Sequence, residues 1–230
     1  MAERIALIMP ALNEEQAIAS TLEDLRGRGL AQVIVVDNGS SDRTAEVARA
    51  HGAQVVTEPQ RGYGQACLAG ISARDLHAEI VVFMDADGSD HPDDLDRLVW
   101  PIARGQADLV LGSRVLGERE SGSLRPQQRF GNWLATLLLC LLYGARYTDL
   151  GPFRAIRREA LAGLGMRDTG FGWTVEMQIK AHQQGLRVLE VPVRYRQRSA
   201  GRSKISGSIR GSILAGAKII WTILRCRFSP

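Results

Sequence analysis

Two aspartates separated by one residue stand where an apolar run ends. Residues 81–92 read VVFMDADGSDHP, so Asp85 and Asp87 follow a β-branched and aromatic segment of the kind that forms buried strands. Carboxylate oxygens, water and substrate phosphates are the ligands that Mg²⁺ and Mn²⁺ prefer, so this pair could hold a metal ion against a diphosphate. The alternative is structural, with Asp87 and Asp90 making turn contacts or capping a helix that begins at Pro92.

Alternating apolar and amphipathic stretches surround this pair. The apolar runs predict strands at 5–9, 33–36, 54–57, 80–84 and 108–111. The stretches between them predict helices at 13–25, 44–51, 64–76 and 93–103. This order indicates an α/β fold, a mostly parallel sheet flanked by helices, and ligands of such sheets bind beyond the carboxyl ends of the strands. The polar segments PALNEE, DNGSSDRT and DADGSD lie at those ends, and we expect them to face one crevice.

Composition limits the class of protein. The 230 residues, 45% of them hydrophobic, are enough for one large α/β domain. The three cysteines are far apart and lack CxxC spacing, which argues against a disulfide framework or zinc site and favours a reducing cytoplasm. The start, MAERIALIMP, lacks the features of a signal peptide. The net charge of +4 is concentrated in a basic stretch at 187–230 that suits anionic lipid or a phosphorylated substrate. No nucleic-acid-binding motif accompanies it, so we expect no nucleic-acid partner.

The pattern changes after residue 112. A loop rich in Gly, Ser and Arg could close over a ligand there. The apolar segment 133–143 is about half as long as a bilayer span, so we expect a buried helix, with an interfacial helix as the alternative. Near the C-terminus, apolar residues recur at helical spacing: Ile209, Ile213, Ala217, Ile220 and Leu224. Arg210 and Lys218 interrupt this amphipathic helix, which should therefore not cross a membrane. It either docks on the core or lies on a membrane surface with Trp221 at the interface.

The segments together resemble a known family. PALNEE, VVDNGSSDRT, RGYGQACLAGI, DADGSDHPDDL and GSR resemble the GT-A nucleotide-binding domain of family 2 inverting glycosyltransferases. TDLGPFRAIRREAL, FGWTVEMQIKA and EVPVRYRQRSAGRSKISG are similar to the dolichyl-phosphate mannose synthase subgroup, so the resemblance covers residues 5 to about 207. It implies a GT-A domain at 1–207, with a nucleotide-binding half (1–112) and an acceptor-side half (113–207), and then a basic amphipathic helix and tail at 208–230. The implied reaction is transfer from a UDP- or GDP-sugar, with Mg²⁺ or Mn²⁺, to a polyprenyl phosphate or related lipid.

The resemblance also assigns roles to residues. It implies that the nucleotide-sugar is bound by Pro10, Ala11, Asn13, Glu14, Asp37, Arg61, Gly62, Gly64, Asp85, Ala86 and Asp87. Asp85 and Asp87 would also face the metal, which with cationic side chains would stabilise charge on the leaving nucleoside diphosphate. The cations available for that role, or for holding an acceptor phosphate, are Arg114, Arg129, Arg198, Arg202 and Lys204. Arg114 and Arg202 are the ones we place in catalysis.

A general base is required only for some acceptors. A hydroxyl must lose its proton as it attacks, whereas a lipid phosphate is already an anion. Glu176 occupies a place resembling that of the family's acidic base, and Asp149 is the second candidate. The structural alternatives are an exposed helix residue for Glu176 and a turn residue for Asp149. Phe153, Phe171 and Trp173 are assigned to the pocket wall or the core.

Three departures from the family pattern bear on these assignments. Asn38 stands where a second aspartate is frequent, Arg43 where glycine is usual, and Ser89 where glutamine often follows the DxD. They leave open the base selectivity and any metal coordination beyond Asp87. No QxxRW follows Glu176, which argues against a processive polysaccharide synthase.

Other functions remain open. One alternative is transfer to a hydroxyl of a lipid or small molecule, with Glu176 or Asp149 as base. Another is a nucleotide-sugar-binding module without turnover. A sugar-1-phosphate nucleotidyltransferase is disfavoured, because PALNEE stands where a glycine-rich loop would be expected.

Overall fold

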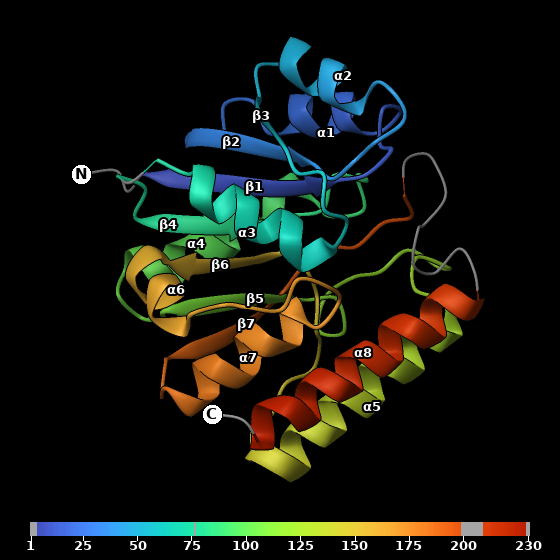
Figure 1. Cartoon of the computed structure of the whole chain (residues 1–230). Helices are drawn as coiled ribbons and strands as arrows, with labels where there is room; N and C mark the ends of the chain where they lie inside the picture. Colours follow the sequence, from blue (N-terminus) through green and yellow to red (C-terminus); the bar gives the residue numbers. More distant parts are fainter. Residues whose placement is uncertain (1–3, 76, 199–208, 229–230) are drawn as a thin grey trace.

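A central sheet organises the chain, as the computed structural model of residues 4–75, 77–198 and 209–228 shows (Figure 1). Its strands are β1 (Ile5–Ala11), β2 (Leu30–Asp37), β3 (Gln54–Thr57), β4 (Ile80–Phe83), β5 (Leu109–Ser113), β6 (Arg154–Arg157) and β7 (Val188–Pro192). They lie in the order β3-β2-β1-β4-β6-β5-β7, and neighbours are parallel except that β6 is antiparallel to β4 and β5. The predicted mostly parallel sheet is confirmed, and the predicted strands all overlap observed ones.

Helices cover both faces of this sheet. They are α1 (Ile18–Asp24), α2 (Thr44–Ala50), α3 (Tyr63–Ala73), α4 (Leu95–Ala103), α5 (Pro126–Tyr143), α6 (Arg158–Leu164), α7 (Trp173–Gln183) and α8 (Ile209–Phe228), with the 3₁₀ turn η1 (Pro92–Asp94) before α4. Helices α1, α2 and α4 pack on the face that includes Leu7 and Val82, and α3, α6 and α7 pack on the face that includes Ile8 and Val81. Because both faces are covered, the central strands read as continuous apolar runs.

Helices α5 and α8 form a pair outside α7, away from the sheet (Figure 1). They share an apolar cluster with α7 that includes Leu139, Ile179 and Ile223. Their other sides are exposed, with 56% of Trp133 and 60% of Trp221 accessible. The expected burial of segment 133–143 therefore holds for one side of α5 only. The C-terminal helix docks on the core and still presents an exposed apolar side, because one helical face is enough to attach it.

No helix in the described part of the chain is both long and apolar enough to span a bilayer.

The first helix is shorter than predicted, because it begins at Ile18 and not near Asn13. Asn13 has a φ of 53°, in the left-handed region that interrupts a right-handed helix. The main-chain amides of Asn13 and Glu14 donate to the hydroxyl oxygens of Ser40 (2.9 Å) and Thr44 (2.8 Å). These bonds join the segments after β1 and β2. The first amides of a helix have no partner within it, so these bonds alone would not prevent a helix from beginning at Asn13. The left-handed backbone of Asn13 does prevent it, and the local pattern could not reveal that conformation.

Candidate active site

A cavity of about 370 Å³ lies at the carboxyl ends of β1, β2 and β4. Its volume is within the roughly 300–1,000 Å³ of small-molecule sites. Its lining residues come from the segments after those strands, the start of α3 and two later segments: Pro10, Ala11, Leu12, Glu14, Asn38, Arg61, Gly62, Tyr63, Ala66, Asp85, Ala86, Asp87, Phe171 and Arg198. The three polar segments thus meet at one place. Of the residues assigned to the nucleotide-sugar, all but Asn13, Asp37 and Gly64 line this cavity.

Those three residues do not line the cavity, but they contact segments close to its wall. The side-chain oxygen of Asn13 accepts from the Ser41 amide (2.7 Å), and that of Asp37 accepts from the Ser40 amide (3.1 Å). Both contacts fix the loop after β2. Gly64 packs so closely that a Cβ there would lie 2.0 Å from the main-chain oxygen of Asp168. We therefore assign these residues to positioning the cavity wall.

Asn38 holds the loop that carries Arg61 and Gly62. Its amide nitrogen donates to the main-chain oxygens of Glu58 (3.1 Å) and Gln60 (2.7 Å), and its side-chain oxygen accepts from the Gly62 amide (2.8 Å). An ionised aspartate cannot donate and would face two carbonyl oxygens here. The contacts therefore explain why asparagine replaces the family's frequent aspartate in this chain.

Buried carboxylates form the floor of the cavity. The Tyr63 hydroxyl donates to Asp85 (3.2 Å), the Asp85 amide donates to Asp90 (3.2 Å), and the amide and hydroxyl of Ser89 donate to Asp87 (2.9 and 2.5 Å). Burial and the nearby Asp87 charge raise the pKa of Asp85 to about 7. Burial, with the charges of Asp85 and Asp87, raises the pKa of Asp90 well above its usual range. The floor therefore holds three carboxyl groups that do not all ionise readily without a counter-charge, which a bound cation would supply.

Arg198 spans the cavity beside these carboxylates. Its Nε lies 2.8 Å from Oδ2 of Asp87, and its Nη2 lies 3.1 Å from Oε1 of Glu14. Arg61, at the rim, donates to the main-chain oxygen of Gly39 (3.2 Å). The cavity thus carries both carboxylates and guanidinium groups, the two kinds of side chain that suit a metal-bound diphosphate. Arg202 and Lys204, assigned to catalysis and phosphate binding, lie outside the described residues.

Arg114 and Asp149 form a buried bidentate ion pair, 35 residues apart in the chain. Nε and Nη2 of Arg114 each lie 2.7 Å from a different oxygen of Asp149, whose side chain is 1% exposed. Although burial opposes it, the charge and hydrogen bonds of Arg114 hold the pKa of Asp149 below its usual value. Both oxygens of Asp149 are thus occupied by a cation. Neither residue lines the 370 Å³ cavity.

The model of the family described as glycosyl transferase family 2 matches residues 6–165. The chain belongs to glycosyltransferase family 2. The GT-A fold and the glycosyltransferase activity predicted from the resemblance are therefore confirmed.

Relatives and solved structures agree with this assignment. An uncharacterized glycosyltransferase of Mycobacterium tuberculosis H37Rv is 41% identical over 214 residues, which are 93% of this chain and 94% of the relative. An undecaprenyl-phosphate mannosyltransferase of Micrococcus luteus is 30% identical in an alignment 241 positions long, gaps included, that covers 97% of this chain and 98% of the relative. The structure of glucosyl-3-phosphoglycerate synthase from M. tuberculosis with Mn²⁺, UDP and glucosyl-3-phosphoglycerate matches with a TM-score of 0.80 and 26% identity, over 100% of this chain and 81% of that one.

Glu176 of this family 2 glycosyltransferase lies apart from the cavity lining. Its side chain is 1% exposed, so the reading of it as an exposed helix residue is wrong. It accepts from the main-chain amides of Asp168 (2.7 Å) and Arg167 (3.1 Å) and lies 2.8 Å from Nζ of Lys180. These contacts fix the loop before α7, and we assign Glu176 a positioning role in that loop.

A second cavity of the glycosyltransferase, of about 450 Å³, lies between the 113–125 segment and α5. Its lining combines cationic, aromatic and aliphatic side chains: Val115, Arg119, Leu124, Pro126, Arg129, Phe130, Asn132, Trp133, Thr136 and Thr148. Arg129, assigned to an acceptor phosphate, is one of them. Such a wall matches a ligand with an anionic head and an apolar body.

Sequence reasoning did not assign Leu12, Tyr63 or Ala66 to the 370 Å³ cavity that they line, nor Asp90 to its floor. Tyr63 binds Asp85 through its hydroxyl, and Asp90 lies against the Asp85 amide with only 1% of its surface exposed. Tyr63 stands inside the RGYG segment that the resemblance already singled out, so a signal for it was present. Asp90 was named only in the structural alternative, as a turn or capping residue, because no local pattern distinguishes a buried aspartate from an exposed one.

Proposed function

We propose that this glycosyltransferase moves a sugar from a UDP- or GDP-sugar, bound with Mg²⁺ or Mn²⁺ in the 370 Å³ cavity, to a polyprenyl phosphate. The observation that carries the proposal is the convergence of Asp85 and Asp87 with Arg61 and Arg198 in one cavity. The solved relative that holds UDP and Mn²⁺ supports the donor and the metal. The Micrococcus relative, a mannosyltransferase to undecaprenyl phosphate, supports the acceptor.

The residues present fit a divalent metal. Oδ1 of Asp90 is buried with no hydrogen-bond partner among the described residues, and burial, with the nearby Asp87 charge, raises the pKa of Asp85, so a cation bound there would favour its ionised form. No three His, Cys, Asp or Glu side chains converge as a metal site in the described ranges. Asp85 and Asp87 would therefore hold the metal together with diphosphate oxygens and water, as is common for Mg²⁺. When bound, the metal stabilises the negative charge of the leaving nucleoside diphosphate.

The protein's own residues would bind the diphosphate and decide whether the acceptor can be deprotonated. Arg198 is already inside the cavity, 2.8 Å from Asp87, and its guanidinium would bind the diphosphate oxygens. The two candidate bases are occupied elsewhere, Asp149 by Arg114 and Glu176 by main-chain amides. A lipid phosphate attacks as an anion and needs neither of them. The occupied carboxylates therefore favour a phosphate acceptor over a hydroxyl.

The second cavity is our candidate for the acceptor's head group. Arg119 and Arg129 supply positive charge, and Phe130 and Trp133 supply apolar surface for the first part of a prenyl chain. Both aromatic side chains are more than half exposed, at 61% and 56%. The acceptor-side half would thus bind the lipid at its junction of charge and aromatic surface.

A phosphorylated small molecule is the second candidate acceptor, because the solved relative of TM-score 0.80 holds glucosyl-3-phosphoglycerate. Such an acceptor attacks through a hydroxyl and would require a base. Replacing Asp149 and Glu176 by their amides tests for a base in one direction only, because both carboxylates also make structural contacts whose loss could lower turnover with either acceptor. Unchanged turnover in both variants supports the lipid phosphate.

The test is release of free nucleoside diphosphate from a panel of UDP- and GDP-sugars with Mn²⁺ or Mg²⁺. Each donor is tested alone, with undecaprenyl phosphate and with 3-phosphoglycerate. Stimulation by undecaprenyl phosphate alone supports the proposal and identifies the donor. Stimulation by 3-phosphoglycerate alone replaces it with the second candidate, and no stimulation by either contradicts both.

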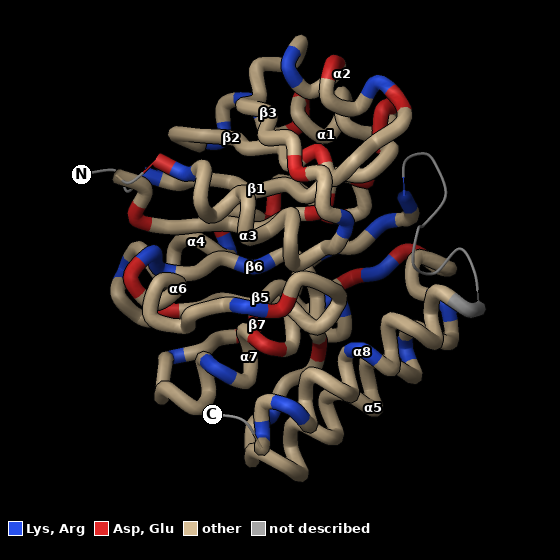
Figure 2. The backbone as a smooth tube through the Cα atoms, in the orientation of Figure 1, with Lys and Arg blue, Asp and Glu red and all other residues tan. Residues whose placement is uncertain are grey.

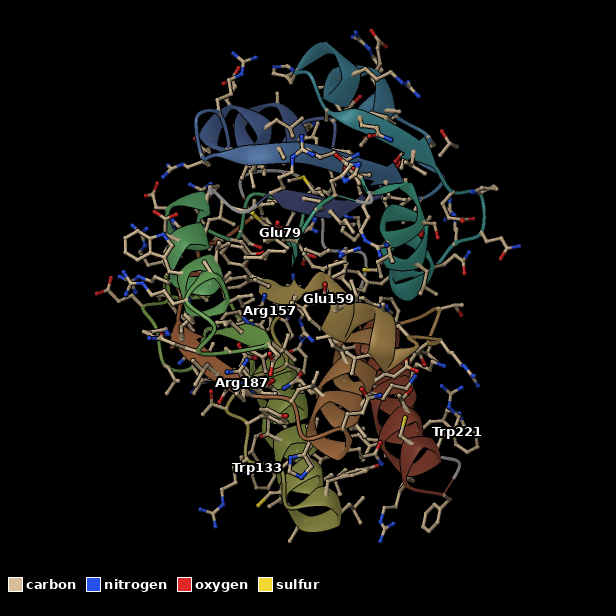
Figure 3. The ribbon with its side chains drawn as sticks, turned by 90° about the vertical axis from the view of Figure 1, so that its left-hand side faces the viewer. Glu79, Trp133, Arg157, Glu159, Arg187 and Trp221 are labelled. Atoms are coloured by element: carbon tan, nitrogen blue, oxygen red, sulfur yellow. The ribbon has the colours of Figure 1, made fainter. Side chains whose placement is uncertain are left out.

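We also propose that α5 and α8 seat the protein on the inner face of the cell membrane. Large apolar side chains are exposed along both helices: Phe130, Trp133, Leu137 and Leu141 on α5, and Ile213, Leu214, Trp221, Leu224 and Phe228 on α8. Figure 3 shows Trp133 and Trp221 where the two helices extend beyond the sheet. Basic residues lie along α8 (Figure 2), whereas α5 has one, Arg129. Apolar surface flanked by cations suits an anionic lipid interface.

Binding to vesicles that contain phosphatidylglycerol is therefore expected at low salt and should weaken as salt is raised, because ions screen exposed charges. Trp221→Ala should lower the bound fraction, as measured by sedimentation. Trp100→Ala is the control, since Trp100 lies on α4 and is 54% exposed, close to the 60% of Trp221. Absence of binding by the unmodified protein at low salt would contradict the membrane proposal.

A further inference from the structure

The loop at residues 167–172, between α6 and α7, contacts both α8 and the cavity of about 370 Å³ proposed to bind the sugar donor, hereafter the donor cavity. We call it the 167–172 loop. Its residue Phe171 lines the cavity, and its residue Asp168 faces α8. Helix α8 is the one that carries Trp221, so one short loop lies between the exposed helix pair and the proposed donor site.

Toward the donor cavity, this loop caps the first turn of α3. The amides of Gly64 and Gln65 donate to the main-chain oxygens of Gly170 (3.2 Å) and Thr169 (2.9 Å). The first amides of a helix have no partner within it, so these carbonyls satisfy donors that would otherwise lack one. A Cβ at Gly62 would lie 2.2 Å from the Thr169 oxygen, which leaves no room for a shift of the loop toward α3. The start of α3, with the cavity residue Tyr63, therefore depends on where the loop sits.

Toward α8, the same loop is held by one buried carboxylate. Oδ2 of Asp168 lies 2.9 Å from Nζ of Lys218 and accepts from the Thr222 hydroxyl (3.1 Å), and Oδ1 accepts from the Gly170 amide (2.8 Å). Asp168 is 1% exposed. Gly172 packs so closely on α8 that a Cβ there would lie 2.1 Å from the Thr222 hydroxyl. A change in the position of α8 would thus move the 167–172 loop, through the ion pair between Lys218 and Asp168 and through the packing of Gly172 against Thr222.

We propose that Lys218 and Asp168 are positioning residues that couple the position of α8 against the 167–172 loop to nucleotide affinity in the donor cavity. The inference rests on the donor role proposed above for that cavity. Coupling between two sites is reciprocal, so a nucleotide bound in the donor cavity should in turn stabilise the docked position of α8. Helix α8, which we propose to bind the membrane, would then change the nucleotide affinity of the donor cavity without contacting the nucleotide.

The test compares Lys218→Met with wild type and with Arg227→Met, which removes an exposed cation from the same helix. Amide hydrogen exchange is measured at residues 62–66 and 167–172, and UDP and GDP affinities are measured calorimetrically with Mn²⁺. We expect faster exchange in both segments and nucleotide binding weakened roughly five- to tenfold in Lys218→Met. Arg227→Met should match wild type, and Lys218→Arg should restore both readouts, because arginine also pairs with Asp168.

The two readouts separate the inference from the proposed function. If Lys218→Met leaves exchange at 62–66 unchanged, the coupling is overturned, whatever the nucleotide result. If exchange rises but the wild type binds neither UDP nor GDP with Mn²⁺, the proposed donor role fails, and the nucleotide part of the inference fails with it. A thermal melt of each variant guards against general unfolding, which would raise exchange in the sheet core as well.

Discussion

Asp87→Ala is expected to lower kcat/KM for the nucleotide-sugar roughly 100- to 1,000-fold, the range seen when one charge-stabilising group is removed from an active site. Asp87 is 6% exposed, lines the donor cavity, and lies 2.8 Å from Nε of Arg198. Its loss removes a proposed metal ligand and leaves Arg198 without one of its two carboxylate partners. The measurement is steady-state release of nucleoside diphosphate across a range of Mn²⁺ concentrations.

Two companion variants sharpen this result. Asp96→Ala removes an exposed carboxylate of α4, outside the donor cavity, and should retain full activity. Asp87→Asn keeps an acceptor for the Ser89 hydroxyl but loses the charge, so it should resemble alanine in activity and wild type in stability. Activity of Asp87→Ala within about threefold of wild type at all Mn²⁺ concentrations would show that Asp87 is not a ligand.

Arg114→Met is expected to lower the free energy of unfolding by about 3–5 kcal/mol, the range for breaking one side of a buried ion pair. The variant leaves the carboxylate of Asp149, 1% exposed, without its bidentate partner. Methionine fills similar volume, so the loss reports mainly the uncompensated charge and not a cavity. Denaturant unfolding at neutral pH measures it.

The same pair predicts how this loss depends on pH. Arg114 holds the folded-state pKa of Asp149 below its usual value, so the pair's contribution is present above the unfolded pKa and is lost as pH falls through the folded one. In Arg114→Met, burial raises the pKa of Asp149, and the side chain takes up a proton more easily. The stability gap between wild type and variant should therefore begin to narrow above pH ~4, at the raised pKa of Asp149 in the variant, and should narrow further until pH falls below the lowered pKa of Asp149 in wild type.

A double variant and a surface variant complete this experiment. Arg114→Met with Asp149→Leu removes both charges and should recover much of the stability that Arg114→Met alone loses, because no unpaired charge remains. Arg26→Met removes an exposed cation and should change stability by less than about 0.5 kcal/mol. If Arg114→Met proves as stable as Arg26→Met, the ion pair between Arg114 and Asp149 does not stabilise the folded state as expected.

The sequence by itself determined the architecture and the position of the proposed donor site. The apolar runs that end at Asp37 and near Asp85 could only be buried strands, and in a parallel sheet their carboxyl ends lie at one edge. The segments after β1, β2 and β4 accordingly meet at one cavity. The family resemblance followed from the same segments, and the family was confirmed.

Only the tertiary structure decided what individual polar side chains do. Glu176 sits on a helix, as its segment suggested, but main-chain amides eight and nine residues earlier occupy its carboxylate. Asp149 is paired with an arginine 35 residues away, and Asn38 donates to carbonyls 20 and 22 residues away.

The helix boundaries show the same division. The first helix begins later than predicted because Asn13 has a left-handed φ of 53°, in a segment whose amides bind side chains 27 and 30 residues away. The spacing of apolar residues along the chain indicates which side of a helix or strand is buried. Side chains on one side recur at a fixed spacing, and burying their apolar surface is favourable whichever apolar neighbours they meet. A hydrogen bond or ion pair depends on one partner within about 3 Å, and that partner comes from whichever segment the fold places there.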